Sequence, residues 1–182
     1  MAYNSNEIFI RVTERIAIIS DTHGHLNERI RGLISNCDHV IHAGDVGSKA
    51  VLDALPHLGT TIVVRGNNDL PEKWLKNEHR VLKQLPLEGR LIVPGGEIVV
   101  VHGDKFGAPR GRHMALRKRY PCARMVVYGH SHQLCVDKES IPWICNPGAA
   151  GNNRTYGGGP SCLVLTASGR RWLIKSYRFT RS

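Results

Sequence analysis

The chain has 182 residues, of which 41% are hydrophobic and 22% are charged. This length suits one domain with one sizeable core and is too short for two ordinary domains. No apolar run approaches the roughly 20 residues of a membrane-spanning helix, and residues 1–14 lack the long apolar stretch of a signal peptide. We therefore expect a cytoplasmic protein that does not contact a membrane.

The net charge of +10 at pH 7 predicts affinity for anions, and nucleic acid is the first partner to consider. The basic residues are spread along the chain, however, and the only dense internal stretch runs from Arg110 to Arg124. The 3 Trp, 5 Tyr and 3 Phe residues do not alternate with basic residues as a base-stacking surface would require. A solvated basic surface is the favoured interpretation, and nucleic-acid binding stays open.

The five cysteines are odd in number and widely spaced, and no pair has CxxC spacing. None lies inside a cluster of ligand-like side chains. We therefore predict free, mostly buried thiols in a reducing compartment. The five are Cys37, Cys122, Cys135, Cys145 and Cys162.

The first half of the chain alternates short β-branched runs with amphipathic stretches, after a lead-in at residues 1–14 that is flexible or adds an edge strand. Residues 15–20 form a continuous apolar run, as in a strand buried on both faces. Apolar residues recur at helical spacing over residues 26–36. The order then repeats, with a strand at 39–43, a helix at 48–58 that Ser48 caps, and a strand at 60–65. This alternation predicts right-handed crossovers and a largely parallel sheet.

The second half of the chain has closely spaced strands. Gly89 and the Gly95-Gly96 pair are expected in turns. We also predict a helix from Pro109 to Arg119 and a surface loop rich in Gly and Asn at 148–160. The predicted strands are 80–85, 90–93, 97–102, 125–128, 134–137, 143–145, 161–166 and 171–179. One α/β domain at residues 15–182, built from two packed sheets, accounts for the whole pattern.

Short polar motifs follow five of the predicted strands at their carboxyl ends. Each motif contains a glycine, which lets the backbone turn tightly. Ligands of open α/β sheets gather at this edge, so segments far apart in the sequence can converge there. The motifs are Asp21-Thr22-His23-Gly24, Gly44-Asp45, Gly66-Asn67-Asn68-Asp69, His102-Gly103 and Gly129-His130-Ser131-His132.

The residue types in these motifs favour a metal centre. Histidine and carboxylate are ordinary ligands of Mn, Fe, Zn and related ions, and cysteine is absent from all five motifs. The candidates exceed the three or four ligands of a single site, which predicts two ions. Asp45 is the expected bridge, because each of its carboxylate oxygens can hold one ion. His42 is a candidate to support Asp45 from outside the set of ligands. The predicted ligands are Asp21, His23, Asp45, Asn67, His102, His130 and His132.

Each motif alone is common in ordinary turns, whereas the five together are not. In this order they resemble the motifs of the calcineurin-like metallophosphoesterases, in particular the small single-domain bacterial and archaeal phosphodiesterases. The resemblance covers residues 15 to about 177. It implies a two-sheet α/β sandwich with helices flanking the sheets, and a turn at residues 146–148 near the site. It also implies that Asp21, His23 and His132 hold one ion, that Asn67, His102 and His130 hold the other, and that Asp45 lies between them.

The same resemblance implies hydrolysis of small phosphate esters, and of diesters in particular, with two divalent ions as cofactors. Manganese is expected, with iron, zinc, nickel or cobalt as alternatives. Two such ions roughly 3.5–4 Å apart lower the pKa of a shared water and hold the phosphate in line with the hydroxide that bridges them. No covalent intermediate with the protein is needed.

Further residues near the expected ligands are candidates for catalysis or substrate binding. Larger phosphatases of this class have histidine where this chain has Asn68, whose amide can bind a phosphate oxygen but cannot transfer a proton. The candidate proton donors in its place are His25, a metal-bound water and the substrate itself. Arg110 and Arg112 are candidates to clamp the phosphate. Asp104 stands where relatives frequently have another histidine.

Two other functions remain open on the sequence. One is a non-catalytic scaffold like the retromer subunit that shares this fold, although such proteins typically lose metal ligands that this chain has. The other is a nuclease, which the net charge favours and the missing aromatic groove does not. A homo-oligomer is compatible with the sequence.

Overall fold

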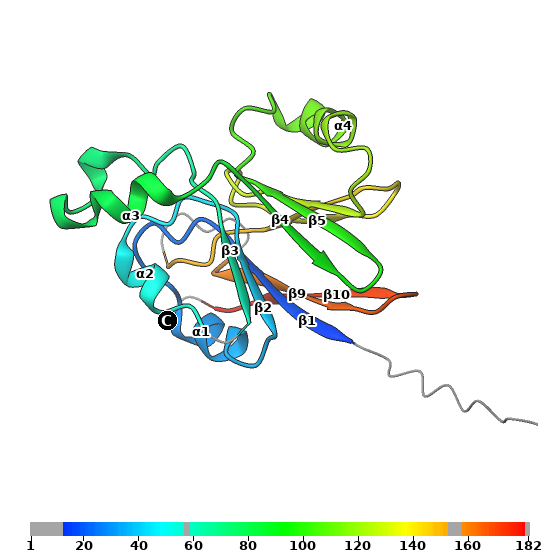
Figure 1. The fold of residues 1–182 in the computed structure, drawn as a ribbon, viewed down its shortest axis with the longest axis horizontal. Coiled ribbons are helices and arrows are strands. Elements are labelled where there is room, and N and C mark those ends of the chain that lie inside the picture. The colour runs from blue at the N-terminus through cyan, green and yellow to red at the C-terminus, as the bar shows by residue number, and fades with distance from the viewer. Residues whose placement is uncertain (1–12, 57–58, 153–157, 181–182) are drawn as a thin grey trace, which may run out of the picture.

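The structure is a computed structural model that describes residues 13–56, 59–152 and 158–180. Two five-stranded sheets pack face to face, with one long helix over the outer face of one sheet and shorter helices against the other sheet (Figure 1). This arrangement confirms the predicted α/β sandwich with flanking helices. Most of the predicted lead-in at 1–14 lies outside the described residues.

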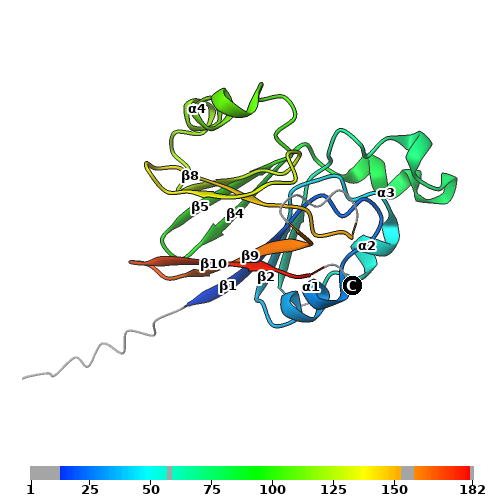
Figure 2. The ribbon, with the colours of Figure 1, turned by 180° about the vertical axis from the view of Figure 1, so that it is seen from behind.

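The first sheet has the strand order β10-β9-β1-β2-β3. Its strands are β1 (Glu14–Ile19), β2 (His39–His42), β3 (Thr60–Val63), β9 (Ser161–Ala167) and β10 (Trp172–Arg178). β1, β2 and β3 pair in parallel, as the alternating first half of the chain predicts. β9 and β10 continue the sheet beyond β1 with antiparallel pairing (Figure 2).

The second sheet has the order β4-β5-β6-β8-β7. Its strands are β4 (Glu88–Val93), β5 (Gly96–Val101), β6 (Met125–Val127), β7 (Leu134–Asp137) and β8 (Trp143–Pro147). β5, β6 and β8 are parallel, so they end at the same edge. Gly95 lies in the β4–β5 turn with φ 94°, whereas Gly89 lies inside β4 and not in a turn. A Cβ at Gly89 would lie 2.4 Å from Ile62 Cγ2, so glycine is needed there for the close approach of β4 to β3.

The helices predicted at 26–36 and 48–58 are shorter than expected, whereas the helix predicted from Pro109 to Arg119 has the expected bounds. The observed helices are α1 (Glu28–Ile34), α2 (Lys49–Asp53), α3 (His79–Gln84), α4 (Pro109–Arg119) and the 3₁₀ turns η1 (Pro71–Lys73) and η2 (Lys76–Glu78). α1 begins after Asn27, whose side chain accepts hydrogen bonds from two backbone N–H groups of the first turn. Ser48 is the N-cap of α2, as predicted, but its side chain makes no capping bond. None of the described helices is both long and apolar enough to cross a membrane.

The strand prediction at residues 80–85 is wrong, because these residues form α3. Leu82 is 1% exposed and packs in a small cluster with Val46, Val51 and Trp74. An apolar run this short fits either a strand or one side of a helix, so its periodicity could not decide between them.

The prediction of a surface loop at 148–160 is also wrong at its beginning. Ala149 and Ala150 are buried, and the Ala150 N–H donates to Ser20 O at 2.8 Å. Residues 153–157 of the predicted loop lie outside the described residues.

Three apolar layers form the core. Between the sheets, Ile16 and Ile18 of β1 belong to one cluster with Ile98 of β5. Ile19, on the opposite face of β1, belongs to a second cluster with Ile30 of α1. This alternation explains the continuous apolar run of residues 15–20, because both faces of the strand are covered.

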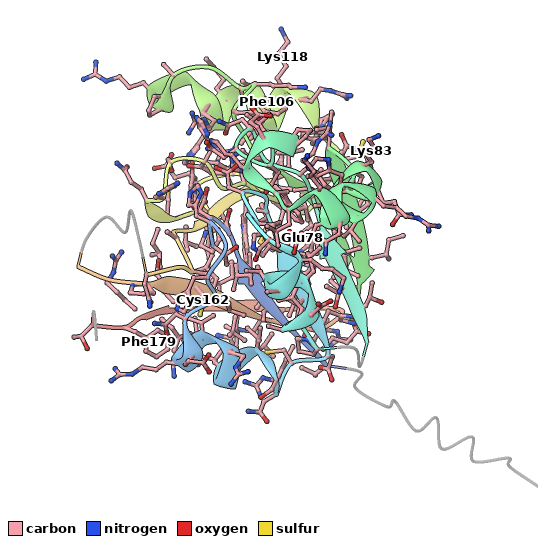
Figure 3. All side chains as sticks on the ribbon, turned by 90° about the vertical axis from the view of Figure 1, so that its left-hand side faces the viewer. Glu78, Lys83, Phe106, Lys118, Cys162 and Phe179 are labelled. Atoms are coloured by element: carbon pink, nitrogen blue, oxygen red, sulfur yellow. The ribbon has the colours of Figure 1, made fainter. Side chains whose placement is uncertain are left out.

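The outer layers close the two faces of the sandwich. Cys162 and Phe179 lie beside α1 on one side (Figure 3). On the other side, Phe106 packs with Tyr120 beneath α4, whereas Lys118 points from α4 into solvent (Figure 3).

The five cysteines are free, as predicted. Cys37, Cys145 and Cys162 are buried, Cys135 is half-buried and Cys122 is exposed. Burial raises the pKa of the Cys145 and Cys162 thiols to about 12, which leaves them protonated and unreactive at neutral pH.

Candidate metal centre

All seven predicted ligands lie just past the carboxyl ends of strands, at one edge of the sandwich. They come from the segments that follow β1, β2 and β3 in the first sheet and β5 and β6 in the second. The first sheet contributes Asp21, His23, Asp45 and Asn67, and the second contributes His102, His130 and His132. The expected convergence at the sheet edge therefore occurs between the two sheets.

One group of ligand atoms surrounds a single small volume. Asp21, His23, Asp45 and His132 each offer an atom within 4.8 Å of all the others. His132 Nε2 lies 3.2 Å from His23 Nε2 and 3.3 Å from Asp21 Oδ1. Two imidazole nitrogens and two carboxylates at this spacing have the composition of a site for one divalent transition metal.

A second group lies on the other side of Asp45. Asn67 Oδ1 is 3.0 Å from His102 Nε2 and 2.9 Å from His130 Nδ1. Asp45 Oδ2 lies 3.4 Å from His102 Nε2 and 3.9 Å from His23 Nε2, so it faces both groups. The division into two groups with Asp45 between them is the one that the resemblance implied.

The buried carboxylate of Asp21 gives an independent test of whether these residues fit a cation. The residue is 0% exposed, and Oδ2 has no hydrogen-bond partner. A buried charged oxygen without a partner is unfavourable, and a metal ion satisfies it directly. The donor set of imidazole, carboxylate and amide oxygen therefore fits a divalent ion.

Backbone strain is concentrated at the same residues. Among the described residues, the non-glycine positions with positive φ are Asp21 (53°), His23 (47°), Asp45 (55°), His130 (64°) and His132 (55°). Left-handed backbone is unfavourable for residues with a Cβ, and such strain clusters where function requires a fixed geometry. All five are predicted ligands, so the strained turns aim ligand side chains. The sequence contains no signal for these φ values.

The ligand loops after β1 and β2 are joined by backbone hydrogen bonds. Asp21 N donates to Gly44 O and His23 N donates to Asp45 O, both at 2.9 Å. Gly47 lies against this pair, and a Cβ there would lie 2.4 Å from Gly24 N. The parallel pairing of β1 and β2 therefore continues into the site.

His42 forms hydrogen bonds to both the loop after β1 and the loop after β2. Gly44 N donates to His42 Nδ1 at 3.2 Å, so Nε2 carries the proton and donates to Thr22 Oγ1 at 2.9 Å. Burial lowers the pKa of His42 to about 4, which keeps the ring neutral. The sequence predicts that His42 supports Asp45, whereas its hydrogen bonds involve the backbone N–H of Gly44 and the side-chain hydroxyl of Thr22.

Two further residues hold ligand loops and have no assigned role in the sequence-based prediction. Asp69 is buried and accepts hydrogen bonds from the backbone N–H groups of Val46, Gly47 and Gly66 at 2.8–3.1 Å. In the sequence, the position of Asp69 in the motif Gly66-Asn67-Asn68-Asp69 was the feature that could have indicated this role. Asn146 Nδ2 donates to Gly129 O at 2.7 Å and so anchors the loop that carries His130 and His132. Asn146 and Pro147 end β8, and the expected turn follows them at Gly148, with φ 74°.

Asn68 is turned toward the carboxylate of Asp45. Its backbone N–H donates to Asp45 Oδ1 at 2.7 Å, and its side-chain Nδ2 donates to Asp45 Oδ2 at 2.8 Å. Its Oδ1 accepts a hydrogen bond of 2.6 Å from Lys73 Nζ. The amide predicted to bind phosphate is thus engaged at both ends by protein groups.

His25, the candidate proton donor, is exposed, and its Nε2 accepts a hydrogen bond from Asn152 Nδ2 at 2.9 Å. The candidate phosphate clamps lie in α4, where Arg110 is exposed and Arg112 is 5% exposed. The Arg112 guanidinium donates to Gly107 O and lies 5.6 Å from the centre of the Tyr128 ring. In the part of the chain that the structure describes, no hydrogen bond joins His25, Arg110 or Arg112 to a predicted ligand.

The electrostatics of the site centre on Asp45 and His102. Burial alone would raise the pKa of Asp45, but the hydrogen bond and charge of His102, with the two bonds from Asn68, hold it below its usual range. Burial alone would lower the pKa of His102, but its hydrogen bond to Asp45 and the charges of Asp21 and Asp45 raise it to about 9. At neutral pH a proton on His102 therefore balances the charge of the neighbouring carboxylates.

The chain is similar to curated proteins and to solved structures. A probable metallophosphoesterase of Methanocaldococcus jannaschii is 31% identical over 144 residues, which cover 75% of this chain and 68% of the relative. A phosphodiesterase of the same organism is 29% identical over 74% of this chain and 82% of its own length. The structure of vacuolar protein sorting 29 from Cryptosporidium parvum has a TM-score of 0.69 at 19% identity, over 92% of this chain and 98% of that one.

The family comparison agrees with the site. Residues 15–170 match the model of the calcineurin-like phosphoesterase superfamily domain, a range that contains every predicted ligand. With its fold, its clustered metal-ligand side chains and this match together, the chain belongs to the calcineurin-like phosphoesterase superfamily.

Proposed function

We propose that this chain is a dinuclear metal-dependent phosphoesterase that favours phosphodiesters of small molecules. The observation that carries the proposal is the convergence of two groups of ligand atoms on Asp45 Oδ2. A carboxylate between two such groups is suited to hold two cations at once, and its strained backbone keeps it there.

The protein residues have three tasks in this proposal. Asp21, His23 and His132 hold one ion, Asn67, His102 and His130 hold the other, and Asp45 bridges them. When bound, two divalent ions supply an acidic water as nucleophile and positive charge for the phosphate. Asn68, Asp69, His42 and Asn146 keep the ligand loops in position. We propose manganese as the native ion.

The preference for diesters has two supports. A 29% identical relative is named a phosphodiesterase. In addition, Asn68 cannot transfer a proton to a leaving group, so esters with good leaving groups are favoured.

The test is elemental analysis combined with hydrolysis of bis-p-nitrophenyl phosphate in Mn, Fe, Co, Ni or Zn. We expect about two ions per chain and metal-dependent release of nitrophenol. Asp45→Asn should lose both, because an amide is neutral and has only one oxygen. Asp53→Asn on the exposed face of α2 should keep both. A fully active Asp45→Asn protein would contradict the bridge.

A non-catalytic scaffold is the second candidate, because the fold also matches vacuolar protein sorting 29 closely. The two candidates differ in a measurable way. Absence of bound metal and of hydrolysis with all five ions would favour the scaffold over the enzyme.

A further inference from the structure

Lys73 connects the candidate bridge to the protein surface. Its Nζ donates to Asn68 Oδ1 at 2.6 Å, and Asn68 Nδ2 donates to Asp45 Oδ2 at 2.8 Å. The ammonium group is therefore two hydrogen bonds away from the oxygen that faces both groups of ligands. The segment that follows β3 and leads to α3 projects from the side of the molecule (Figure 1).

The backbone at Lys73 is anchored, although its side chain is exposed. Asp69, on one side, is buried and bonded to three backbone N–H groups. Trp74, on the other, is 5% exposed and packs with Val46 and Leu82. Pro71 starts η1 and fixes its first φ angle. The lysine is thus presented beside the site by a rigid turn, and its long stem can still move.

The ammonium group of Lys73 has more N–H donors than its hydrogen bond to Asn68 uses. A lysine has three N–H donors, and Lys73 uses one on Asn68. Among the described residues, no carboxylate lies within ion-pair distance of its Nζ. A cation beside a site for anions, with two donors left, suits an anionic ligand.

We propose that Lys73 binds the phosphate group of the substrate directly, with Asn68 holding its ammonium beside Asp45. The inference rests on the proposed function, because it takes a phosphate ester as the ligand of the metal site. It assigns the contact to a charged residue, while Asn68 keeps its amide on the bridge and serves as a positioning residue.

Two variants separate a substrate contact from a structural role. Lys73→Gln loses the charge and shortens the side chain by one bond, but it keeps an N–H donor for Asn68 Oδ1. Lys73→Arg keeps both the charge and the donor. The matched control is Lys76→Gln in η2, which is three residues further on and also exposed.

The experiment measures binding of inorganic phosphate to the manganese-loaded protein by calorimetry, at low and at physiological salt, with bound metal quantified in each variant. A hydrogen bond from a charged donor strengthens binding more than one from a neutral donor, and the effect is smaller for an exposed lysine than for a buried one. We expect phosphate binding about 10-fold weaker in Lys73→Gln, with a smaller salt dependence and unchanged metal content. Lys73→Arg and Lys76→Gln should stay near the wild type.

Other outcomes would contradict either the inference about Lys73 or the proposed function. Equal phosphate affinity and equal salt dependence in Lys73→Gln and the wild type would overturn the inference, as would a wild type that binds no phosphate. A wild type that binds phosphate but hydrolyses no ester would contradict the proposed function, while the variants would still decide the role of Lys73.

Discussion

Asp45 and His102 form a charge pair inside the metal-free protein. Asp45 Oδ2 lies 3.4 Å from His102 Nε2, and both side chains are 1% exposed. Because the pKa of His102 is raised to about 9, its imidazole carries a proton at pH 7. Metal binding requires the neutral ring, so a proton and an ion compete for the same nitrogen.

This competition predicts a pH dependence of metal binding. The folded pKa of His102 lies above the ordinary value of about 6.5, so the protonated form dominates below pH about 9. The apparent affinity for the second ion should therefore increase as the pH rises from 7 to 9. Calorimetry at pH 7 in buffers of different ionisation enthalpy should detect release of a proton on binding.

His102→Gln supplies the control for this prediction. The variant has no ring to titrate, so the pH dependence between 7 and 9 should flatten as its affinity falls. Metal binding to the wild type without proton release at pH 7 would contradict the assigned charge pair.

The ligand loops depend on glycine where two of them touch. Gly47 has φ 85°, and a Cβ there would lie 2.4 Å from Gly24 N and 2.6 Å from His23 C. These are backbone atoms of the β1 loop, so they cannot move aside without moving His23. The close contact therefore serves both the stability of the fold and the aim of a ligand.

Gly47→Ala should destabilise the protein by about 1–3 kcal/mol and weaken metal binding, because strain and overlap add at this position. Gly32→Ala is the matched control. Gly32 lies in α1, where an added Cβ would meet nothing within 4 Å, so alanine should stabilise the protein by about 0.5–1 kcal/mol. Urea unfolding of the metal-free proteins measures both changes. Equal stabilities of the two variants would show that Gly47 is not constrained.

At the level of elements, the sequence predicts most of what the structure contains. β1, β2 and β3 are buried on both faces or end in recognisable motifs, so their runs of apolar residues are sufficient. The sequence pattern of α3 fits a strand as well as a helix. The packing of Leu82 that accompanies the helix involves Val46 and Val51, which are distant in sequence. A local sequence pattern cannot show contacts between residues that are distant in the sequence.

The ligands of the candidate site can be predicted from local sequence patterns. The contacts that hold these ligands in place cannot. Residue type and strand order alone are enough to place Asp21 and His132 at one edge. The left-handed backbone of both residues and the contact between Asn68 and Lys73 arise only when separate loops meet. The pattern of residue types indicates which side chains can bind a metal. Tertiary contacts determine how those side chains are held.

At the scale of the whole molecule, the candidate metal centre joins the two sheets. Asp21, Asp45 and Asn67 follow strands of one sheet, whereas His102 and His132 follow strands of the other. The buried Oδ2 of Asp21 has no hydrogen-bond partner, and Oδ1 of the same carboxylate lies 3.3 Å from the imidazole of His132 across this junction. Bound ions would therefore connect elements that are otherwise held together here by loop contacts.

Metal binding should consequently stabilise the whole fold. An ion at 100 times its dissociation constant stabilises the native state by about 2.7 kcal/mol. For a chain of this size, about 2–4 °C of melting temperature corresponds to each kcal/mol, so manganese should raise Tm by about 5–10 °C. Calorimetric scans with manganese and after chelation would measure the shift. Asp45→Asn should show little of it, because both groups of ligands lose their shared carboxylate, and an equal rise in that variant would place the stabilising ion elsewhere.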